Sequence, residues 1–344
     1  MCNSIIILTF GQVQTKFILP FLFSFIFSTI AIWFLLRIGC NFKAKPSPLR
    51  LSLKRLGGGV VILIFVLAIF FNADLVITRP ISGIIVGSLM ILIFGFWDDL
   101  KNINWKWQLA AQIVIAVSAI SFGVKSDYIT NPFGGIINLN NPFLYFFIFT
   151  FYFLLFINSL NWLDGIDGLS ASVTLVALGT IFFLSLLPHV NQPAVAILAA
   201  IAGGAILGFL VFNWHPAKIL AGTSGAWFFG FLLASLSIFA GAKIATVLMA
   251  TLIPVLDLAN VVWERHRAGQ SIFSGGDNRH LHHKLLKLGL DERLIVVLVA
   301  AASILIGLVA LNVSAMGKVI FIVLFSIFYF GLVRIIRVIG AIRG

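Results

Sequence analysis

The chain reads Asn158-Ser-Leu-Asn161-Trp-Leu-Asp164-Gly-Ile-Asp167-Gly168-Leu169 between two long apolar runs, 142–157 and 169–187. Asn and Asp side chains are unfavourable near the hydrocarbon of a bilayer, so two amides and two carboxylates at three-residue spacing indicate a functional site. The alternative is that they only form a turn at a membrane surface, but a turn needs one or two such residues. The stretch predicts two membrane helices joined by a chemically active loop.

The rest of the chain has the composition of a membrane protein. Its 344 residues are 61% hydrophobic and only 10% charged, whereas soluble proteins have about 25% charged residues. Apolar runs that approach the roughly 20 residues of one crossing fall at 17–38, 56–73, 81–97, 108–124, 142–160, 170–188, 194–213, 225–241, 244–263, 293–312 and 318–338. The prediction is an all-α integral membrane protein with about eleven transmembrane helices, forming a single polytopic domain over 1–344.

The basic residues predict the orientation of this domain. With the N-terminus outside and the C-terminus in the cytoplasm, 18 of the 23 Lys and Arg residues fall on the cytoplasmic side. The five left outside are Lys16, Arg79, Lys125, Lys243 and Lys318. Such an asymmetry is typical of plasma-membrane proteins. It also explains the net charge of +12 without a nucleic-acid partner, for which a soluble basic domain would be needed.

The same orientation places the chemistry at the cytoplasmic face. Nine of the eleven carboxylates and five of the six histidines fall there; the exceptions are Asp74, Asp127 and His189. A transporter would place polar residues in the middle of broken helices, whereas here they lie at helix ends. With only Cys2 and Cys40 as cysteines, no disulfide framework is indicated. We therefore expect active-site loops at 40–56, 98–107, 158–169, 213–225 and 264–292.

Two adjacent acids, Asp98 and Asp99, close the third apolar run. Carboxylates at the C-terminal end of a helix oppose its dipole, and adjacent acids repel each other. A bound cation or a role at a phosphate would explain the pair. The alternative is that they cap the next helix, which begins near 106.

The four polar residues of the opening stretch cannot all face one ligand in a straight helix. At 3.6 residues per turn the first and last of Asn158, Asn161, Asp164 and Asp167 point in opposite directions. Gly165 and Gly168 are expected to relax the backbone. Asn161 and Asp164 should then face one ligand, with Asp167 on another part of it.

The loop 264–292 contains Arg279, His280, His282 and His283. Interleaved cations and the absence of a nearby Cys favour phosphate binding over a zinc site, although His280 and His283, not His282, share a helix face. A solvated basic loop is the simpler alternative. Asp257 could pair with Arg265 or Lys284 across this loop, which would be a structural role. Gly57 and Gly58, after the basic loop from Lys43 to Arg55, would let a backbone or ligand approach closely.

Taken together, these residues resemble the polyprenyl-phosphate N-acetylhexosamine-1-phosphate transferases of glycosyltransferase family 4. The resemblance extends from 40 to 292 and rests on ordered motifs. They are Arg-Leu-Gly-Gly at 55–58, Asp98-Asp99, Asn158-x-x-Asn161-x-x-Asp164-Gly-x-Asp167-Gly, Pro216-Ala217, Pro254-x-x-Asp257 and His280-x-His282-His283. Eleven spans look like the branch that includes the undecaprenyl-phosphate GlcNAc-1-phosphate transferases. His-Leu-His-His, where the cell-wall translocase branch has three consecutive histidines, favours a UDP-N-acetylhexosamine over UDP-MurNAc-pentapeptide.

The resemblance implies that a polyprenyl phosphate attacks the sugar-linked phosphorus of a UDP-sugar, releases UMP and starts a lipid-linked cell-envelope glycan. It implies Mg²⁺, or alternatively Mn²⁺, as cofactor, and the lipid bilayer and the two substrates as partners; a homodimer is compatible with it. Asp98 and Asp99 would be catalytic, and Asn161 and Asp98 would bind the metal. Substrate would contact Asn158, Asp164, Asp167, Arg279, His280, His282, His283, Gly57 and Gly58.

One position departs from the family pattern. The family reads Gly-Asp-x-Gly-Ser, and its Asp is a chief Mg²⁺ ligand, whereas this chain reads Gly222-Thr223-Ser224-Gly225-Ala226. Either the other acids, with Asp257 as a candidate, hold the metal, or the chain is a catalytically impaired relative that binds lipid or nucleotide without turnover. The many intact motifs favour a working phosphoglycosyl transferase.

Overall fold

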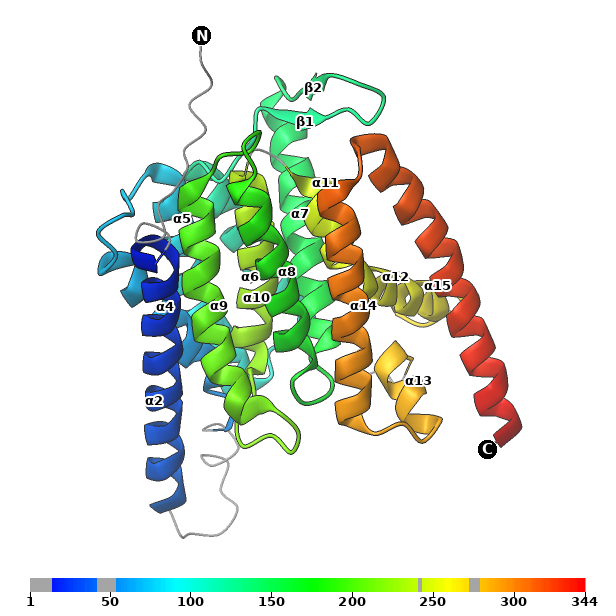
Figure 1. The fold of residues 1–344 in the computed structure, drawn as a ribbon. Helices are drawn as coiled ribbons and strands as arrows, with labels where there is room; N and C mark the ends of the chain where they lie inside the picture. Colours follow the sequence, from blue (N-terminus) through cyan, green and yellow to red (C-terminus); the bar gives the residue numbers. More distant parts are fainter. Residues whose placement is uncertain (1–13, 42–53, 241–242, 272–278, 344) are drawn as a thin grey trace.

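The computed structural model describes residues 14–41, 54–240, 243–271 and 279–343, and almost all of its regular structure is helical (Figure 1). Parts of the loops predicted at 40–56 and 264–292, including Lys43, Lys45, Arg50 and Asn278, lie outside these ranges. In chain order the elements are η1 (Gln14–Ile18), α2 (Leu19–Asn41), α4 (Gly57–Phe70), α5 (Arg79–Lys101), α6 (Trp105–Ser121), β1 (Tyr128–Thr130), β2 (Ile136–Asn138), α7 (Pro142–Leu163), α8 (Leu169–Leu186), α9 (Pro193–Asn213), α10 (Gly222–Phe239), α11 (Ile244–Ala250), α12 (Leu252–Arg267), α13 (Leu281–Lys287), α14 (Glu292–Asn312) and α15 (Ala315–Arg343).

Eight helices in the described part are long and apolar enough to cross a membrane, or nine if the bent pair α11 and α12 forms one span. The all-α membrane class is therefore confirmed, while eleven crossings and the orientation of the termini stay predictions. Every predicted apolar run coincides with a helix, but the run at 244–263 does not form a straight one. It bends by 77° between α11 and α12, and α12 lies across the bundle toward α15 (Figure 1).

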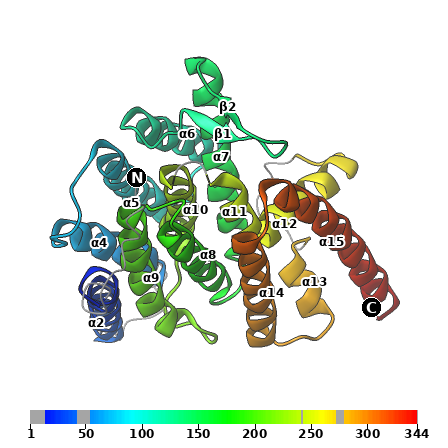
Figure 2. The same ribbon diagram turned by 45° about the horizontal axis from the view of Figure 1, so that its top comes forward.

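The bundle is built around α10. This helix packs against α4, α5, α7 and α8. Of the residues in its most apolar 18-residue stretch, 83% are buried, compared with 17% in the corresponding stretch of α15. In the view of Figure 2, α10 lies inside the ring of neighbouring helices while α2 and α15 are at the periphery. The exposed aromatic and aliphatic side chains of the outer helices, such as Phe34 and Leu324, are those expected to face lipid tails.

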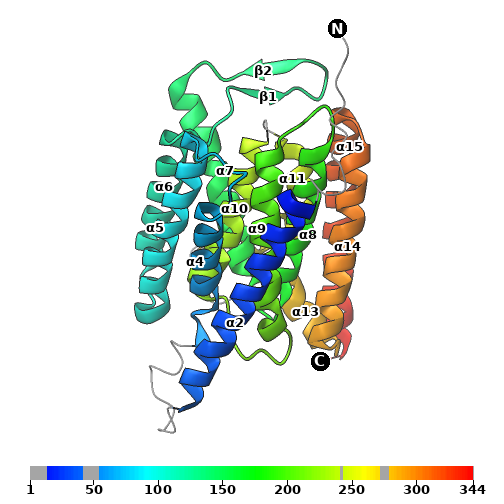
Figure 3. The same cartoon turned by 60° about the vertical axis from the view of Figure 1, so that its left-hand side comes forward.

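Short polar connections gather at one end of the bundle. Asn102, in the left-handed conformation with φ 46°, ends α5, and the Asn104 side chain accepts a hydrogen bond from the Lys106 amide to start α6. Gly168, with φ 77°, begins α8. The α7–α8 connection, the α9–α10 connection and α13 lie at this end, and the antiparallel hairpin of β1 and β2 lies at the other (Figures 1 and 3).

Candidate active site

A pocket of about 520 Å³ opens at the end of the bundle where the polar connections gather. Its walls come from the residues before α4, the end of α5, the α7–α8 connection and the start of α10. The lining residues are Arg55, Asp99, Asn102, Asn161, Asp164, Gly165, Ile166, Asp167, Asn213, Leu220, Gly222 and Thr223. The tertiary structure thus brings together Asp99, Asn161, Asp164 and Asp167 from the predicted site, and adds Arg55 as a cation among three carboxylates.

The adjacent acids Asp98 and Asp99 have different environments. Asp99 lines the pocket and accepts hydrogen bonds from the backbone amides of Thr223 (2.8 Å) and Ser224 (3.3 Å), at the N-terminus of α10. Asp98 does not line it. Its carboxylate accepts from the Ile103 amide, the Gln108 side chain and the Thr223 hydroxyl, at 3.0, 2.9 and 2.6 Å. Asp98 thus ties the end of α5 to the start of α6 without capping it, because the cap of α6 is Asn104. Asp99 lines the pocket and is available to a ligand.

Gly57 and Gly58 bring the start of α4 against the start of α10. Their amides donate to the carbonyls of Leu220 (3.2 Å) and Ala221 (3.1 Å). A Cβ on Gly58 would lie 2.2 Å from the Cα of Gly225, so the contact requires glycine. The expectation of close backbone approach is confirmed. A contact of either glycine with substrate stays a prediction, since neither residue lines the pocket.

Two of the residues that end α7 face different surroundings. Asn158 exchanges hydrogen bonds with Gln112 on α6, at 2.8 Å and 3.4 Å, and is not among the pocket residues. Asp164 caps the end of α7, lines the pocket and accepts a short hydrogen bond from Ser170. Burial raises the pKa of Asp164 to about 6; the charges of Asp99 and Asp167 act in the same direction, and the Ser170 hydroxyl opposes them. A cation in the pocket would favour its ionised form.

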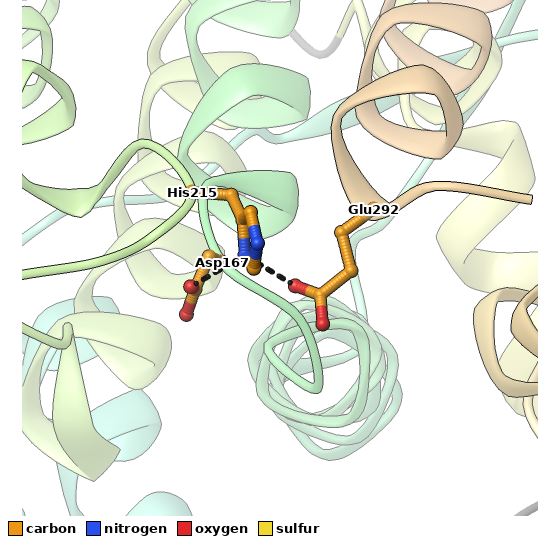
Figure 4. A group of neighbouring side chains, drawn as sticks. All are labelled: Asp167, His215 and Glu292. Carbon is orange, nitrogen blue, oxygen red and sulfur yellow. Dashed lines mark hydrogen bonds and ion pairs between the residues drawn. The ribbon is translucent and has the colours of Figure 1, made fainter.

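Asp167 is fixed by a histidine that the sequence did not single out. His215 Nδ1 lies 3.0 Å from Asp167 Oδ2 and 3.0 Å from Glu292 Oε2 (Figure 4). The Ala217 amide donates to the same Asp167 oxygen at 2.9 Å. The donor atoms of the three side chains lie within 4.8 Å of one another, close enough to share a metal ion. Because the imidazole already bridges the two carboxylates at hydrogen-bond distance, the group also holds itself together without one.

These contacts join three connections that are distant in sequence. Asn213, at the end of α9, accepts a hydrogen bond from the Gly168 amide (3.1 Å) and donates to the Ile219 carbonyl (2.9 Å). His215 follows in the same connection, and Glu292 begins α14. The only sequence signal for His215 and Glu292 was their place in connections at the active end of the chain.

The three predicted histidines form one cluster beside the pocket. His280 precedes α13 with extended backbone (ψ 149°), which is why its ring can stack on His282 although they are two residues apart. His280 Nδ1 lies 2.7 Å from Asp257 Oδ2, and Asp257 also accepts from Tyr329 (3.1 Å). Asp257 therefore has a structural partner, but it is His280, and Lys284 pairs with Glu264 instead. Asp257 is absent from the pocket lining and does not replace the missing family acid there.

His282 lies against the pocket wall. Its Nε2 lies against Gly165, where a Cβ would approach it to 2.2 Å. Both ring nitrogens are buried without a hydrogen-bond partner in the described part of the chain. Burial lowers the pKa of His282 to about 3, with Asp257 opposing that shift. A neutral imidazole with unused donor and acceptor atoms fits the prediction that this residue contacts substrate. Arg279, by contrast, lines a different cavity, between α12 and α15.

The donor set of the pocket suits a hard divalent cation. Asp99, Asp164 and Asn161 offer carboxylate and amide oxygens, the ligands that Mg²⁺ and Mn²⁺ prefer. Asn161 lines the pocket as expected of a metal ligand, whereas Asp98 is directed at protein donors. Residues Asp99 and Asp164 are therefore better placed than Asp98 to accompany Asn161.

Comparisons with known proteins show which transferases this sequence is similar to. Residues 81–241 match the model of glycosyl transferase family 4. A probable undecaprenyl-phosphate N-acetylglucosaminyl 1-phosphate transferase of Bacillus subtilis is 25% identical over 83% of this chain and 80% of its own length. A decaprenyl-phosphate N-acetylglucosaminephosphotransferase of Mycobacterium tuberculosis is 28% identical over 76% and 71%. A phospho-N-acetylmuramoyl-pentapeptide-transferase of Geobacillus is 26% identical over 86% and 96%. This chain is therefore similar to glycosyl transferase family 4 over residues 81–241, and to these three transferases over about three quarters or more of its length.

Proposed function

We propose that the protein is a phosphoglycosyl transferase that moves N-acetylhexosamine-1-phosphate from a UDP-sugar to a polyprenyl phosphate. The observation that carries this proposal is the polar pocket at the end of an apolar bundle, where Asp99, Asn161, Asp164 and Asp167 converge. The relatives named for undecaprenyl- and decaprenyl-phosphate N-acetylglucosamine transfer support this substrate pair. His280-Leu-His282-His283 favours a simple UDP-N-acetylhexosamine, and the product would begin a lipid-linked cell-envelope glycan.

In the proposed reaction a lipid phosphate oxygen attacks the sugar-linked phosphorus of the UDP-sugar. A new P–O bond forms between the lipid phosphate and the sugar-linked phosphorus, the bond from that phosphorus to the bridging oxygen breaks, and UMP leaves with the bridging oxygen. Such a transfer depends mainly on positioning and charge neutralisation. A divalent cation held by Asp99, Asn161 and Asp164 would neutralise the diphosphate when bound.

The protein groups have separate tasks in this proposal. Arg55, which lines the pocket beside Asp99, would attract the phosphates. Asp167, held in place by His215 and Ala217, would orient the nucleotide. The neutral His282 would offer a hydrogen bond without adding charge. Because UDP-sugars are cytoplasmic, the proposal also requires the pocket to face the cytoplasm, as the distribution of basic residues predicts.

The direct test is UMP release by the purified full chain with polyprenyl phosphate, UDP-GlcNAc and Mg²⁺. We expect turnover, and a roughly 10²–10³-fold loss in Asp99→Asn, the range seen when one transition-state electrostatic contact is removed. Asp127→Asn is the matched control, because Asp127 is an exposed acid that pairs with Lys125 near the hairpin at the opposite end. It should retain full activity.

Thr223→Asp, in the same assay, tests the departure from the family pattern. The Thr223 hydroxyl donates to Asp98 at 2.6 Å, so an aspartate there would face Asp98 with like charge. We expect the variant to need Mg²⁺ more strongly than the parent does. No release by the parent but release by Thr223→Asp would contradict a working native site. No release by either with several UDP-sugars would contradict the transferase proposal.

A further inference from the structure

A second and larger cavity, of about 960 Å³, lies between α12 and α15, outside the pocket described above. None of its lining residues is shared with that pocket. Figures 1 and 2 show α12 running toward α15, with α13 alongside. The cavity is distinguished by its arginines, which are Arg267, Arg279, Arg334 and Arg337.

The acid in this cavity is already neutralised. Glu264 is the carboxylate among its lining residues, and it pairs with Lys284 at 2.9 Å and with Arg337 at 2.6 Å. Arg267 lies over the Trp263 ring, 4.8 Å from its centre. Within the part of the chain that the structure describes, neither Arg267 nor Arg334 has a carboxylate partner. The cavity therefore carries excess positive charge from at least these two guanidinium groups.

Apart from Asn260, the remaining lining residues of the cavity are apolar, and two of the aromatic ones are exposed. Trp263 is 53% exposed and Phe330 is 39% exposed. Arg334 and Arg337 lie near the C-terminal end of the candidate span Ala315–Ile339, the depth at which lipid headgroups meet a membrane helix. Free phosphate would use the guanidinium groups but not the aromatic walls. A lipid with an anionic headgroup would use both.

We propose that the cavity between α12 and α15 binds the phosphate headgroup of an anionic membrane phospholipid, with Arg267 and Arg334 as its principal contacts. Basic pockets between membrane helices on the cytoplasmic side characteristically hold such headgroups. The acyl chains would lie along Trp263 and Phe330. The bound lipid would thereby hold the bent helix α12 against α15, because the two helices make few direct contacts with each other. This proposal does not depend on the transferase activity.

The test is binding of short-chain lipids to the purified full chain in a neutral detergent, by thermal unfolding and native mass spectrometry. Dioctanoyl phosphatidylglycerol should raise the unfolding temperature, and neither dioctanoyl phosphatidylcholine nor inorganic phosphate should match it. In the double variant Arg267→Gln, Arg334→Gln, phosphatidylglycerol should bind roughly 30-fold more weakly, because two positive charges that would contact its headgroup are removed. Lysine at both positions should retain part of the affinity.

Arg37→Gln is the matched control. Arg37 is also an exposed arginine over a tryptophan ring, 4.6 Å from the centre of Trp33, but it belongs to α2. The Arg37→Gln variant should bind phosphatidylglycerol as tightly as the parent does. Equal lipid binding by the double variant and the parent would overturn the proposal, as would equal stabilisation of the parent by inorganic phosphate alone. If the double variant does not fold, the two single variants give the same comparison, each with a smaller loss.

Discussion

At the scale of single residues, two adjacent carboxylates at the end of α5 are stabilised by other helices. A helix C-terminus disfavours negative charge. Asp99 nevertheless accepts hydrogen bonds from two amides in the first turn of α10, whose own N-cap residue supplies no side-chain cap. Unpaired amides at a helix N-terminus favour an anion. Asp98 is satisfied by Ile103, Gln108 and Thr223. The acids therefore serve the structure as well as the proposed chemistry.

The buried His282 leads to a prediction about acid stability. Its pKa is lowered from 6.5 to about 3, chiefly by burial, so between these pH values the unfolded chain binds more protons than the folded one. Stability is therefore lost as the pH falls below 6.5, by up to about 1.4 kcal/mol per pH unit from this residue. His282→Asn, which does not titrate, should lose stability less steeply. Unfolding midpoints measured from pH 7 to pH 4 check this. Identical slopes for His282→Asn and the parent would show that the imidazole is not held neutral in the folded protein.

At the scale of elements, the site depends on how closely α4 approaches α10. The paired contacts of Gly57 and Gly58 with Leu220 and Ala221 set the spacing of the two helix starts. That spacing positions Arg55, just before α4, beside Gly222 and Thr223, at the start of α10. A side chain on either helix at this point would push the starts of α4 and α10 apart and change the shape of the pocket.

We therefore expect Gly58→Ala to destabilise the protein and to lower its activity together. A Cβ there would lie 2.2 Å from backbone atoms of Gly225, and overpacking of this kind typically costs about 1–3 kcal/mol. Gly179→Ala in α8 is the control, because a Cβ there meets nothing within 4 Å. Alanine should be neutral or stabilising by up to about 1 kcal/mol. Denaturant unfolding and UMP release test both, and equal stabilities would contradict a glycine-dependent contact.

At the scale of the whole molecule, the two ends differ in chemistry. The pocket, the histidine cluster and the arginine-lined cavity lie toward the end that holds α13, whereas the β1–β2 hairpin lies at the opposite end (Figure 3). Lys125 and Asp127, near the hairpin, form an exposed ion pair. This polarity is what a protein that uses cytoplasmic substrates and a membrane acceptor would require.

The predicted orientation can be tested in intact cells with an impermeant thiol reagent. In a background with Cys2→Ser and Cys40→Ser, we expect Phe133→Cys to be labelled, because the hairpin residue is 83% exposed and predicted to lie outside. Lys287→Cys on the exposed surface of α13 should react only after the membrane is opened. The reverse pattern would place the pocket outside the cell and would contradict the proposed use of UDP-sugars.

The sequence by itself determined the membrane class, the positions of the apolar helices and the grouping of acids and histidines in connections at one end. These follow from local properties, because each run of apolar residues must satisfy its backbone in lipid as a helix. The family resemblance of the motifs from Arg55 to His283 was likewise present in the linear chain.

Only the tertiary structure decided which of these residues meet. Asp98 and Asp99 are adjacent in sequence but differ by about 100° around α5, so one accepts hydrogen bonds from Ile103 and Gln108 and the other lines the pocket. Asn158 pairs with Gln112, and Asp257 with His280, because packing brings distant helices together. The bend between α11 and α12, and the arginine-lined cavity between α12 and α15, also result from long-range packing. Hydropathy along the chain sets which segments enter the membrane, whereas packing between distant segments sets the partners of each polar side chain.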